Sequence, residues 1–470
     1  MKTVTPQRPD LPGPGSPWAW LIPIAFLSVM LLAVFLPRTD KAPAAATPAL
    51  TPNSASRPAA TRPGREPYAG RPRPAAATSP ARSAEEAVAE KLNRFARNHQ
   101  AIVAAWAKHL NVAVPADVSR FFEAIQAGRW AETTNLFAAL YQAKQGSDAD
   151  PALKRLWPAI NETYGVALEA HDWPAQKLLD YGNAILDSLR PGMIYVGGTD
   201  AGRFIPTLLA ETSDGGGPVV LTQNALADNS YLDYLSFRYG DQLNTLTSED
   251  AQKAFQTYIA DAQQRLQHDQ QFPDEPKQLR PGEDVRVTDG RVQVGGQVAV
   301  MLINEQLMQM LLQKNPDTSF ALQESFPLKS FYGGATTLGP ITELNAGPAN
   351  PLTADTAAQS LDYWRATTQN LLAETDTAGA PRDNYAKLIL AQANLFQDHN
   401  LIAEATQAYQ LANSLNPAAP EAVFNYVSAL LGQQRFDEAR QVAQTAANLA
   451  PNNAQFAQLL RQLTARSRKM

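Results

Sequence analysis

The chain has 470 residues, a formal net charge of −5 at pH 7 and no cysteine. At about 150 residues per domain, this length predicts two or three folded units rather than one compact core. The absence of cysteine excludes disulfides and thiolate metal sites, and the excess of acidic residues argues against a nucleic-acid binder, so we expect no nucleic-acid partner.

An apolar segment near the N-terminus is long enough to cross a bilayer. Residues 18–36 carry no charged side chain, and at roughly 1.5 Å per residue a helix of this length spans about 29 Å, close to the thickness of the hydrocarbon core. We therefore predict a single transmembrane helix that contacts the lipid bilayer, preceded by a tail at 1–17. A cleaved signal peptide is the alternative, because Ala44, Ala45 and Ala46 follow, although the apolar run exceeds the about 7 to 15 residues usual in that role.

Residues 37–82 are rich in proline and alanine and contain almost no large apolar side chain. Burial of so little surface cannot offset chain entropy, so we predict a disordered linker. Its basic residues are dispersed, which is typical of a solvated linker, and attraction to anionic lipid is the alternative. Such a linker would hold the folded part away from the bilayer.

The segment 83–189 has apolar residues at three- and four-residue spacing, which is the period of amphipathic helices. Pro115, Gly128, Pro151 and Pro174 interrupt the pattern and mark the ends of successive helices. We therefore predict a helical domain here, with a helical hairpin that turns at Gly128.

From residue 190 the pattern changes to short apolar strands that alternate with helical stretches. Four main strands are expected, at 193–196, 219–222, 319–323 and 341–344. This order predicts a parallel sheet flanked by helices, and hence an α/β domain over 190–350. Two valine-rich strands separated by Asp289 and Gly290 predict a hairpin within it.

Polar residues follow three of these strands, at the edge where ligands bind in sheets of this kind. They are Gly197, Gly198, Thr199, Asp200, Arg203, Gln223, Asn224, Asp228 and Glu324. Two glycines before a helix let backbone N–H groups approach an anion, and Arg203 could pair with it. This pattern predicts a site for a sugar- or phosphate-bearing ligand, while the simpler interpretation is that Asp200 caps the helix and the glycines form the turn.

Other chemistry has little support in the residues. No two histidines stand at metal-ligand spacing on a shared helix, and the sequence has neither a phosphate-binding loop with its lysine nor a nucleophile elbow. The histidines are His99, His109, His171, His268 and His399. We therefore predict no metal, no cofactor and no catalytic residue, and we favour a binding protein over an enzyme.

The most specific signal lies in the C-terminal helical segment 354–470, where small residues and a proline recur after 34 positions. The repeated positions are Ala405, Tyr409, Ala412 and Pro417 in the first repeat, and Ala439, Ala443, Ala446 and Pro451 in the second. These residues resemble the tetratricopeptide repeat, with repeats at about 386–419 and 420–453. The resemblance implies stacked helix pairs whose concave face binds a protein partner.

The first helix of each repeat departs from that family's pattern. Gln392 and Ala393 stand in one repeat, and Tyr426 and Val427 in the other, where a leucine-glycine pair is usual. Because two repeats seldom suffice alone, we expect a helix around 361–372, or the α/β domain, to cover the open end.

The middle domain carries a second resemblance. Its strand ending in Gly197 with Asp200 three residues on, and its later strands, are similar to the soluble region of bacterial polytopic proteins like the protein O-mannosyltransferases. The present sequence does not contain that family's many membrane helices and catalytic loops. What the resemblance implies is therefore an extracytoplasmic location and an accessory role in the cell envelope.

These features predict a multidomain α/β plus all-α protein, anchored by one transmembrane helix and periplasmic or otherwise extracytoplasmic in its folded part. Its predicted role is protein interaction or scaffolding in the cell envelope through the tetratricopeptide repeats. The alternative is an accessory enzyme or a ligand-binding module that uses the α/β loops.

Overall fold

The structure, a computed structural model, describes residues 82–145, 150–288, 291–347, 350–374 and 379–467. The predicted transmembrane segment 18–36 and the tail before it lie outside these residues, as does the linker 37–82 except for Arg82. Within the described ranges, no helix is both long and apolar enough to cross a membrane.

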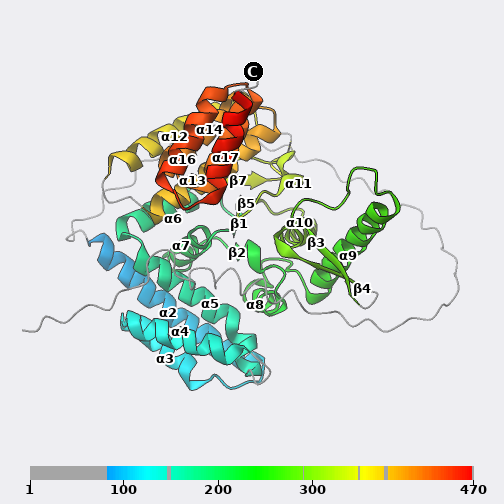
Figure 1. The fold of residues 1–470 in the computed structure, drawn as a ribbon. Coiled ribbons are helices and arrows are strands. Elements are labelled where there is room, and N and C mark those ends of the chain that lie inside the picture. The colour runs from blue at the N-terminus through cyan, green and yellow to red at the C-terminus, as the bar shows by residue number, and fades with distance from the viewer. Residues whose placement is uncertain (1–81, 146–149, 289–290, 348–349, 375–378, 468–470) are drawn as a thin grey trace, which may run out of the picture.

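Helices make up the described chain before the sheet (Figure 1). They are α2 (Ala84–His109), α3 (Ala116–Gln126), α4 (Trp130–Lys144), α5 (Pro151–Asp172) and α6 (Ala175–Leu186). The predicted breaks are confirmed: Pro115 and Pro174 directly precede α3 and α6, and Pro151 is the first residue of α5. Gly128 separates α3 from α4 with a φ of 67°, a left-handed conformation that glycine adopts without strain.

A five-stranded sheet lies between these helices and the C-terminal repeats (Figure 1). Its strands are β1 (Ile194–Gly197), β2 (Val220–Thr222), β5 (Phe320–Gln323), β6 (Thr336–Leu338) and β7 (Ile341–Leu344), in the spatial order β2-β1-β5-β7-β6. The prediction of a parallel sheet is correct only for β2, β1 and β5, because β7 and β6 pair antiparallel. The sheet is therefore mixed, and its strand β6 is too short to give a periodic signal in the sequence.

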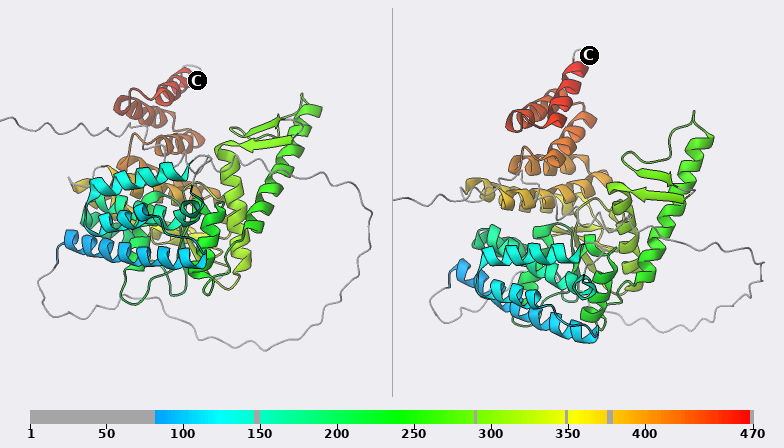
Figure 2. Two further views of the ribbon diagram at one scale, coloured as in Figure 1. Left: turned by 90° about the horizontal axis from the view of Figure 1, so that it is seen from below. Right: turned by 60° about the horizontal axis from the view of Figure 1, so that its bottom comes forward.

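Helices and a separate hairpin complete the middle of the chain. The helices are α7 (Asp200–Glu211), η2 (Gln223–Ala225), α8 (Asn229–Tyr239), α9 (Ser248–Gln271), α10 (Gly296–Lys314) and α11 (Lys329–Tyr332). The predicted valine-rich strands are β3 (Asp284–Thr288) and β4 (Arg291–Gly295), which pair antiparallel, while the turn residues between them lie outside the described ranges. Figure 2 shows that α9 and this hairpin project away from the remainder of the fold.

The central sheet is buried on both faces, as expected for parallel strands covered by helices. All four residues of β1 are buried. Tyr195 belongs to the hydrophobic cluster that contains α6, α7, α12 and the repeats. Ile194 and Val196 point to the other face, in the cluster that contains α8 and α10. The two clusters therefore cross the predicted boundaries at 189 and 350.

The C-terminal part is all helical. It consists of α12 (Ala354–Ala373), α13 (Ala380–Asp398), α14 (Ile402–Leu415), α15 (Pro420–Gly432), α16 (Phe436–Leu449) and α17 (Ala454–Ser467). We expected either a helix around 361–372 or the α/β domain to cover the open end of the first repeat, and both do. Helix α12 packs against α14, and the sheet strand β7 packs against α13.

Gln392 on α13 joins the repeats to the sheet. Its Oε1 accepts hydrogen bonds from Ser360 Oγ and from Trp364 Nε1, the latter at 2.9 Å, both on α12. Its Nε2 donates to the carbonyl oxygens of Gly339 at 2.8 Å and Ile341 at 3.0 Å, in the β6–β7 hairpin. The side chain is fully buried, and both its oxygen and its nitrogen are bonded. The residue that departs from the tetratricopeptide pattern at this position therefore joins α13, α12 and the β6–β7 hairpin.

We predict that Gln392→Ala lowers the free energy of unfolding by about 2–4 kcal/mol, because it leaves the indole N–H and two carbonyls buried without partners. Urea unfolding followed by circular dichroism measures this. Gln458→Ala, at an exposed position on α17, serves as the matched control and should change stability by less than about 0.5 kcal/mol. Equal effects of the two substitutions would contradict a special role for Gln392.

Candidate functional site

The structure brings the predicted loop residues after β1, β2 and β5 together. These strands are neighbours and parallel, so their carboxyl ends share one edge of the sheet. Asn224 Nδ2 donates to the Gly198 carbonyl at 3.0 Å. The amide of Ser325 donates to Gln223 Oε1 at 3.0 Å, and its hydroxyl donates to Asn224 Oδ1 at 2.8 Å. The polar groups of the three loops therefore bond mainly to one another.

Gln323, the last residue of β5, takes the position that an anion would occupy at the start of α7. Its side-chain oxygen accepts from the amides of Gly198 at 3.1 Å and Thr199 at 2.9 Å, and from the Thr199 hydroxyl at 3.1 Å. The side chain is buried. Neutral amide oxygen thus satisfies the N–H groups that the sequence suggested for a phosphate or sugar ligand.

The glycines of these loops permit close packing between the strand ends. A Cβ on Gly198 would lie 2.3 Å from the Ser325 amide nitrogen, and a Cβ on Gly202 would lie 2.0 Å from Gln323 Oε1. Both distances are far below van der Waals contact, so any larger residue would displace Gln323 or the loop after β5. Close packing of the two loops, and not the approach of a ligand, therefore explains why a glycine stands at position 198.

Asp200 does not cap α7, contrary to the simpler interpretation of the sequence. Thr199 is the N-cap: its backbone is extended and its hydroxyl accepts from the Gly202 amide at 3.1 Å. Asp200 lies in the first turn and pairs with Arg203 at 2.7 Å. Asp228 has the capping role at α8, where it accepts from the Ser230 amide at 2.9 Å.

Arg203 is the predicted residue with the most unusual surroundings. It is only 4 % exposed, its guanidinium lies 4.2 Å from the centre of the Phe204 ring, and its Nε has no hydrogen-bond partner among the described residues. It borders a small cavity of about 30 Å³ together with Glu162, Asp228 and Tyr231. This cavity lies where α5 meets the carboxyl end of β2.

Glu324 points away from the other predicted site residues and toward the repeats. Both of its carboxylate oxygens accept from the Tyr332 hydroxyl, at 2.9 and 3.1 Å, and Asn394 of α13 also donates to it. Burial raises the pKa of Glu324 to about 8, and these hydrogen bonds oppose the shift only in part. Glu324 therefore belongs to the junction between the sheet and the first repeat.

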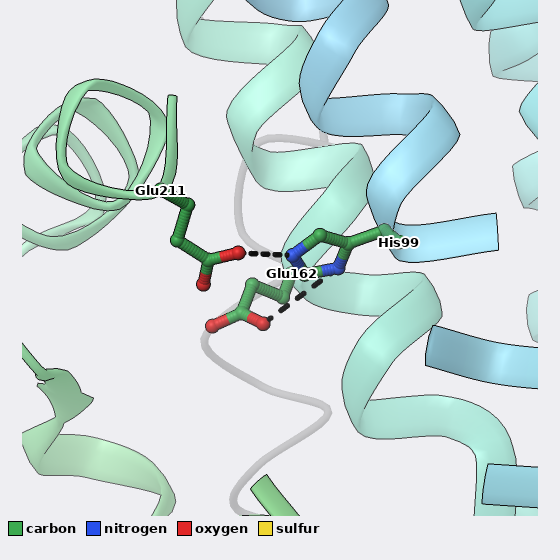
Figure 3. A group of neighbouring side chains, drawn as sticks. All are labelled: His99, Glu162 and Glu211. Atoms are coloured by element: carbon green, nitrogen blue, oxygen red, sulfur yellow. Dashed lines mark hydrogen bonds and ion pairs between the residues drawn. The ribbon is translucent and has the colours of Figure 1, made fainter. Parts of the chain in front are cut away.

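A buried group that the sequence did not indicate lies between α2, α5 and α7. His99 has no exposed surface, and its ring stacks on Phe95 with 4.0 Å between ring centres. Nε2 of His99 lies 2.9 Å from Glu211 Oε2, and Nδ1 lies 4.0 Å from Glu162 Oε2 (Figure 3). His99 and Glu211 are 112 positions apart, so no local spacing could have paired them.

Residues of α8 surround this group. Arg238 pairs with Glu211 at 3.2 Å, and the Tyr234 hydroxyl donates to Glu162 at 3.1 Å. Burial raises the pKa of Glu211, but His99 and Arg238 outweigh it, and the resulting pKa is about 2. For Glu162 burial prevails and the pKa is raised. The group joins four helices. Its two carboxyl groups differ in pKa, which is lowered for Glu211 and raised for Glu162.

The repeat residues occupy the positions that helix stacking requires. Small or aromatic side chains at the crossings are buried: Ala405, Tyr409 and Ala412 on α14, and Ala439, Ala443 and Ala446 on α16. The Tyr409 hydroxyl donates to Asn394 and Gln397 of α13, both at 2.8 Å. Pro417 and Pro451 lie in the turns that follow α14 and α16, where proline ends a helix.

Residues 398–463 match the tetratricopeptide repeat family. The prediction of these repeats is thereby confirmed for that segment, which supports a protein-interaction role. Comparisons with curated proteins and with solved structures give no match. The resemblance of the middle domain to proteins like the O-mannosyltransferases therefore stays a prediction.

We predict that Gln323→Ala lowers the free energy of unfolding by about 1–3 kcal/mol, because the amides of Gly198 and Thr199 lose their hydrogen-bond acceptor. Inorganic phosphate should restore part of this loss by binding those amides, while the unsubstituted chain should not respond. Thermal unfolding at increasing phosphate concentration, at constant ionic strength, measures both effects. A phosphate response equal in the two proteins would show that Gln323 does not fill the site.

Proposed function

We propose that this chain is a membrane-anchored, extracytoplasmic repeat protein that binds a protein partner through the inner surface of its tetratricopeptide repeats. The observation that carries the proposal is the repeat match at 398–463 on helices whose one side is buried and whose other side is polar and accessible. The role of such a protein in the cell envelope is interaction or scaffolding.

The first helices of the two repeats supply the accessible surface. On α15 the buried residues are Ala422, Val423, Tyr426, Val427 and Leu430. Opposite them, Glu421, Asn425 and Ser428 recur at helical spacing and are exposed or half-exposed. On α13, Lys387 and Asp398 are exposed, and the charge of Lys387 interacts with that of Glu421. We call these five residues the inner stripe. Polar helix faces of this kind are available to a partner without any rearrangement of the core.

The sheet contributes to the same surface. Glu324, after β5, interacts with Asn394 of α13 by a hydrogen bond and with Glu421 of the inner stripe by charge repulsion. Because these two carboxyl groups are close enough to interact, the half-buried loop after β5 lies near the stripe. This arrangement supports a binding surface shared between the repeats and the α/β domain.

The membrane anchor rests on the charge-free segment 18–36, whose length matches a bilayer. Alkaline carbonate extraction tests it: the full chain should stay with the sedimented bilayers, and a chain beginning at residue 38 should be released. Release of both would contradict the anchor. The ligand-binding alternative stays a prediction of the sequence, since Gln323 already bonds the amides on which it rests.

Partner capture with the tagged full chain tests the proposed surface. Deletion of the repeats would open the core shared with the sheet, so substitutions on α15 are the better probe. We expect Asn425→Arg with Ser428→Arg to lower partner recovery at least tenfold, because two bulky cations are placed in the contact. Gln441→Arg, at an exposed position on α16 outside the stripe, is the control and should leave recovery unchanged. The proposal fails if the stripe substitutions retain full recovery.

A further inference from the structure

The imidazole of His99 is held so that one of its nitrogens faces a carboxylate without a bond. Nε2 lies at hydrogen-bond distance from Glu211, 2.9 Å, so in the neutral ring this nitrogen carries the proton and donates it. Nδ1 then presents a lone pair. It is buried, has no hydrogen-bond partner among the described residues, and faces Glu162 Oε2 at 4.0 Å (Figure 3). Two electron-pair donors thus face each other across a gap too long for a hydrogen bond.

We propose that a divalent transition-metal ion binds in this gap, with His99 Nδ1 and Glu162 as its protein ligands. Imidazole nitrogen and carboxylate oxygen bind Zn²⁺ at about 2.0–2.2 Å, so a gap of this width admits one ion after small side-chain rotations. Glu211 holds the ring through Nε2, which is the arrangement by which a carboxylate orients a metal-binding histidine. One ligand atom each from His99, Glu162 and Glu211 lies within 4.8 Å of the others.

The surrounding residues orient the carboxylates as an outer shell does. The Tyr234 hydroxyl donates to Glu162 Oε2 at 3.1 Å, and Arg238 pairs with Glu211 Oε1 at 3.2 Å. Both oxygens of Glu211 are thus held, Oε1 by Arg238 and Oε2 by His99. Oε2 of Glu162 both accepts from Tyr234 and faces His99 Nδ1, and its second lone pair remains for the ion. Such outer partners set ligand direction and basicity in metal sites.

The balance of charge also favours a cation at this point. Two carboxylates, on Glu162 and Glu211, lie beside one guanidinium, on Arg238, so with a neutral imidazole the buried group has an excess negative charge. Burial of such a charge is costly unless a cation compensates it. Burial is the main cause of the raised pKa of Glu162, and the charge of Glu211 adds to it. A divalent ion bound to Glu162 would lower this pKa.

Space for further ligands exists beside Glu162. The cavity of about 30 Å³ is lined by Glu162, Asn161 and Asp228, and it has room for one or two waters. His99 does not line this cavity, so waters held there would reach the ion from the side of Glu162. A site with open positions can exchange its ion and its waters, unlike a closed structural site.

Zn²⁺ titration of the full chain tests the proposal. After dialysis against EDTA and its removal, calorimetry should give about one Zn²⁺ per chain, and saturating Zn²⁺ should raise Tm by at least about 2 °C. The chain has no cysteine and only five histidines, so no thiolate and few other imidazoles compete for Zn²⁺. His99→Gln and Glu162→Gln should each lower the Zn²⁺ affinity at least about tenfold.

His109→Gln is the matched control, since His109 is exposed on the same helix, and it should bind Zn²⁺ as the unsubstituted chain does. Equal affinity in His99→Gln and the unsubstituted chain would overturn the proposal. Should the variants fail to fold, the unsubstituted chain alone still tests the proposal. If it gives no heat and no change in Tm with Zn²⁺ while its stability falls as pH rises, a proton rather than a metal lies between His99 and Glu162.

Discussion

A buried side-chain amide is costly to leave without hydrogen-bond partners, and at Gln392 this cost fixes how the repeats lie against the sheet. Its oxygen is bonded by α12 and its nitrogen by the β6–β7 hairpin, while its backbone belongs to α13. Displacement of any one element leaves a donor or acceptor buried without a partner, at a cost of about 1–3 kcal/mol. The shared hydrophobic cluster supplies most of the attraction between the sheet and the repeats, and Gln392 makes one orientation favourable over others.

A second glutamine has the same effect at the carboxyl end of β5. Gln323 binds the amides that open α7 and so fixes the loop after β1 against the loop after β5. The edge of the sheet where ligands bind in related architectures is here closed by the protein's own side chain. The accessible polar surface lies instead on the repeats, with Glu324 beside it, which is why the proposed partner site is assigned there.

The sequence predicted those features whose cause is local. Proline and glycine end helices by their own backbone geometry, so the breaks at Pro115, Gly128, Pro151 and Pro174 could be placed correctly. Pairing between distant strands has no such signal, so β7 was wrongly predicted to be part of a parallel sheet, and β6 was not predicted at all. The loop residues after β1 and β2 were brought together as expected, but their role depends on Gln323, which only the fold places at α7. His99, Glu162 and Glu211 come from three separate helices, and each alone is an ordinary residue of an amphipathic pattern.

The sheet and the repeats share a core and the Gln392 junction, so we expect them to unfold as one unit. Native-state hydrogen exchange, followed by mass spectrometry at increasing denaturant, measures this most directly. Amides of α13, β5 and β7 should exchange with the same free energy of opening, and this free energy should equal that of global unfolding. If the amides of the repeats exchange with a free energy of opening several kcal/mol below that of the sheet amides, the two parts do not unfold as one unit.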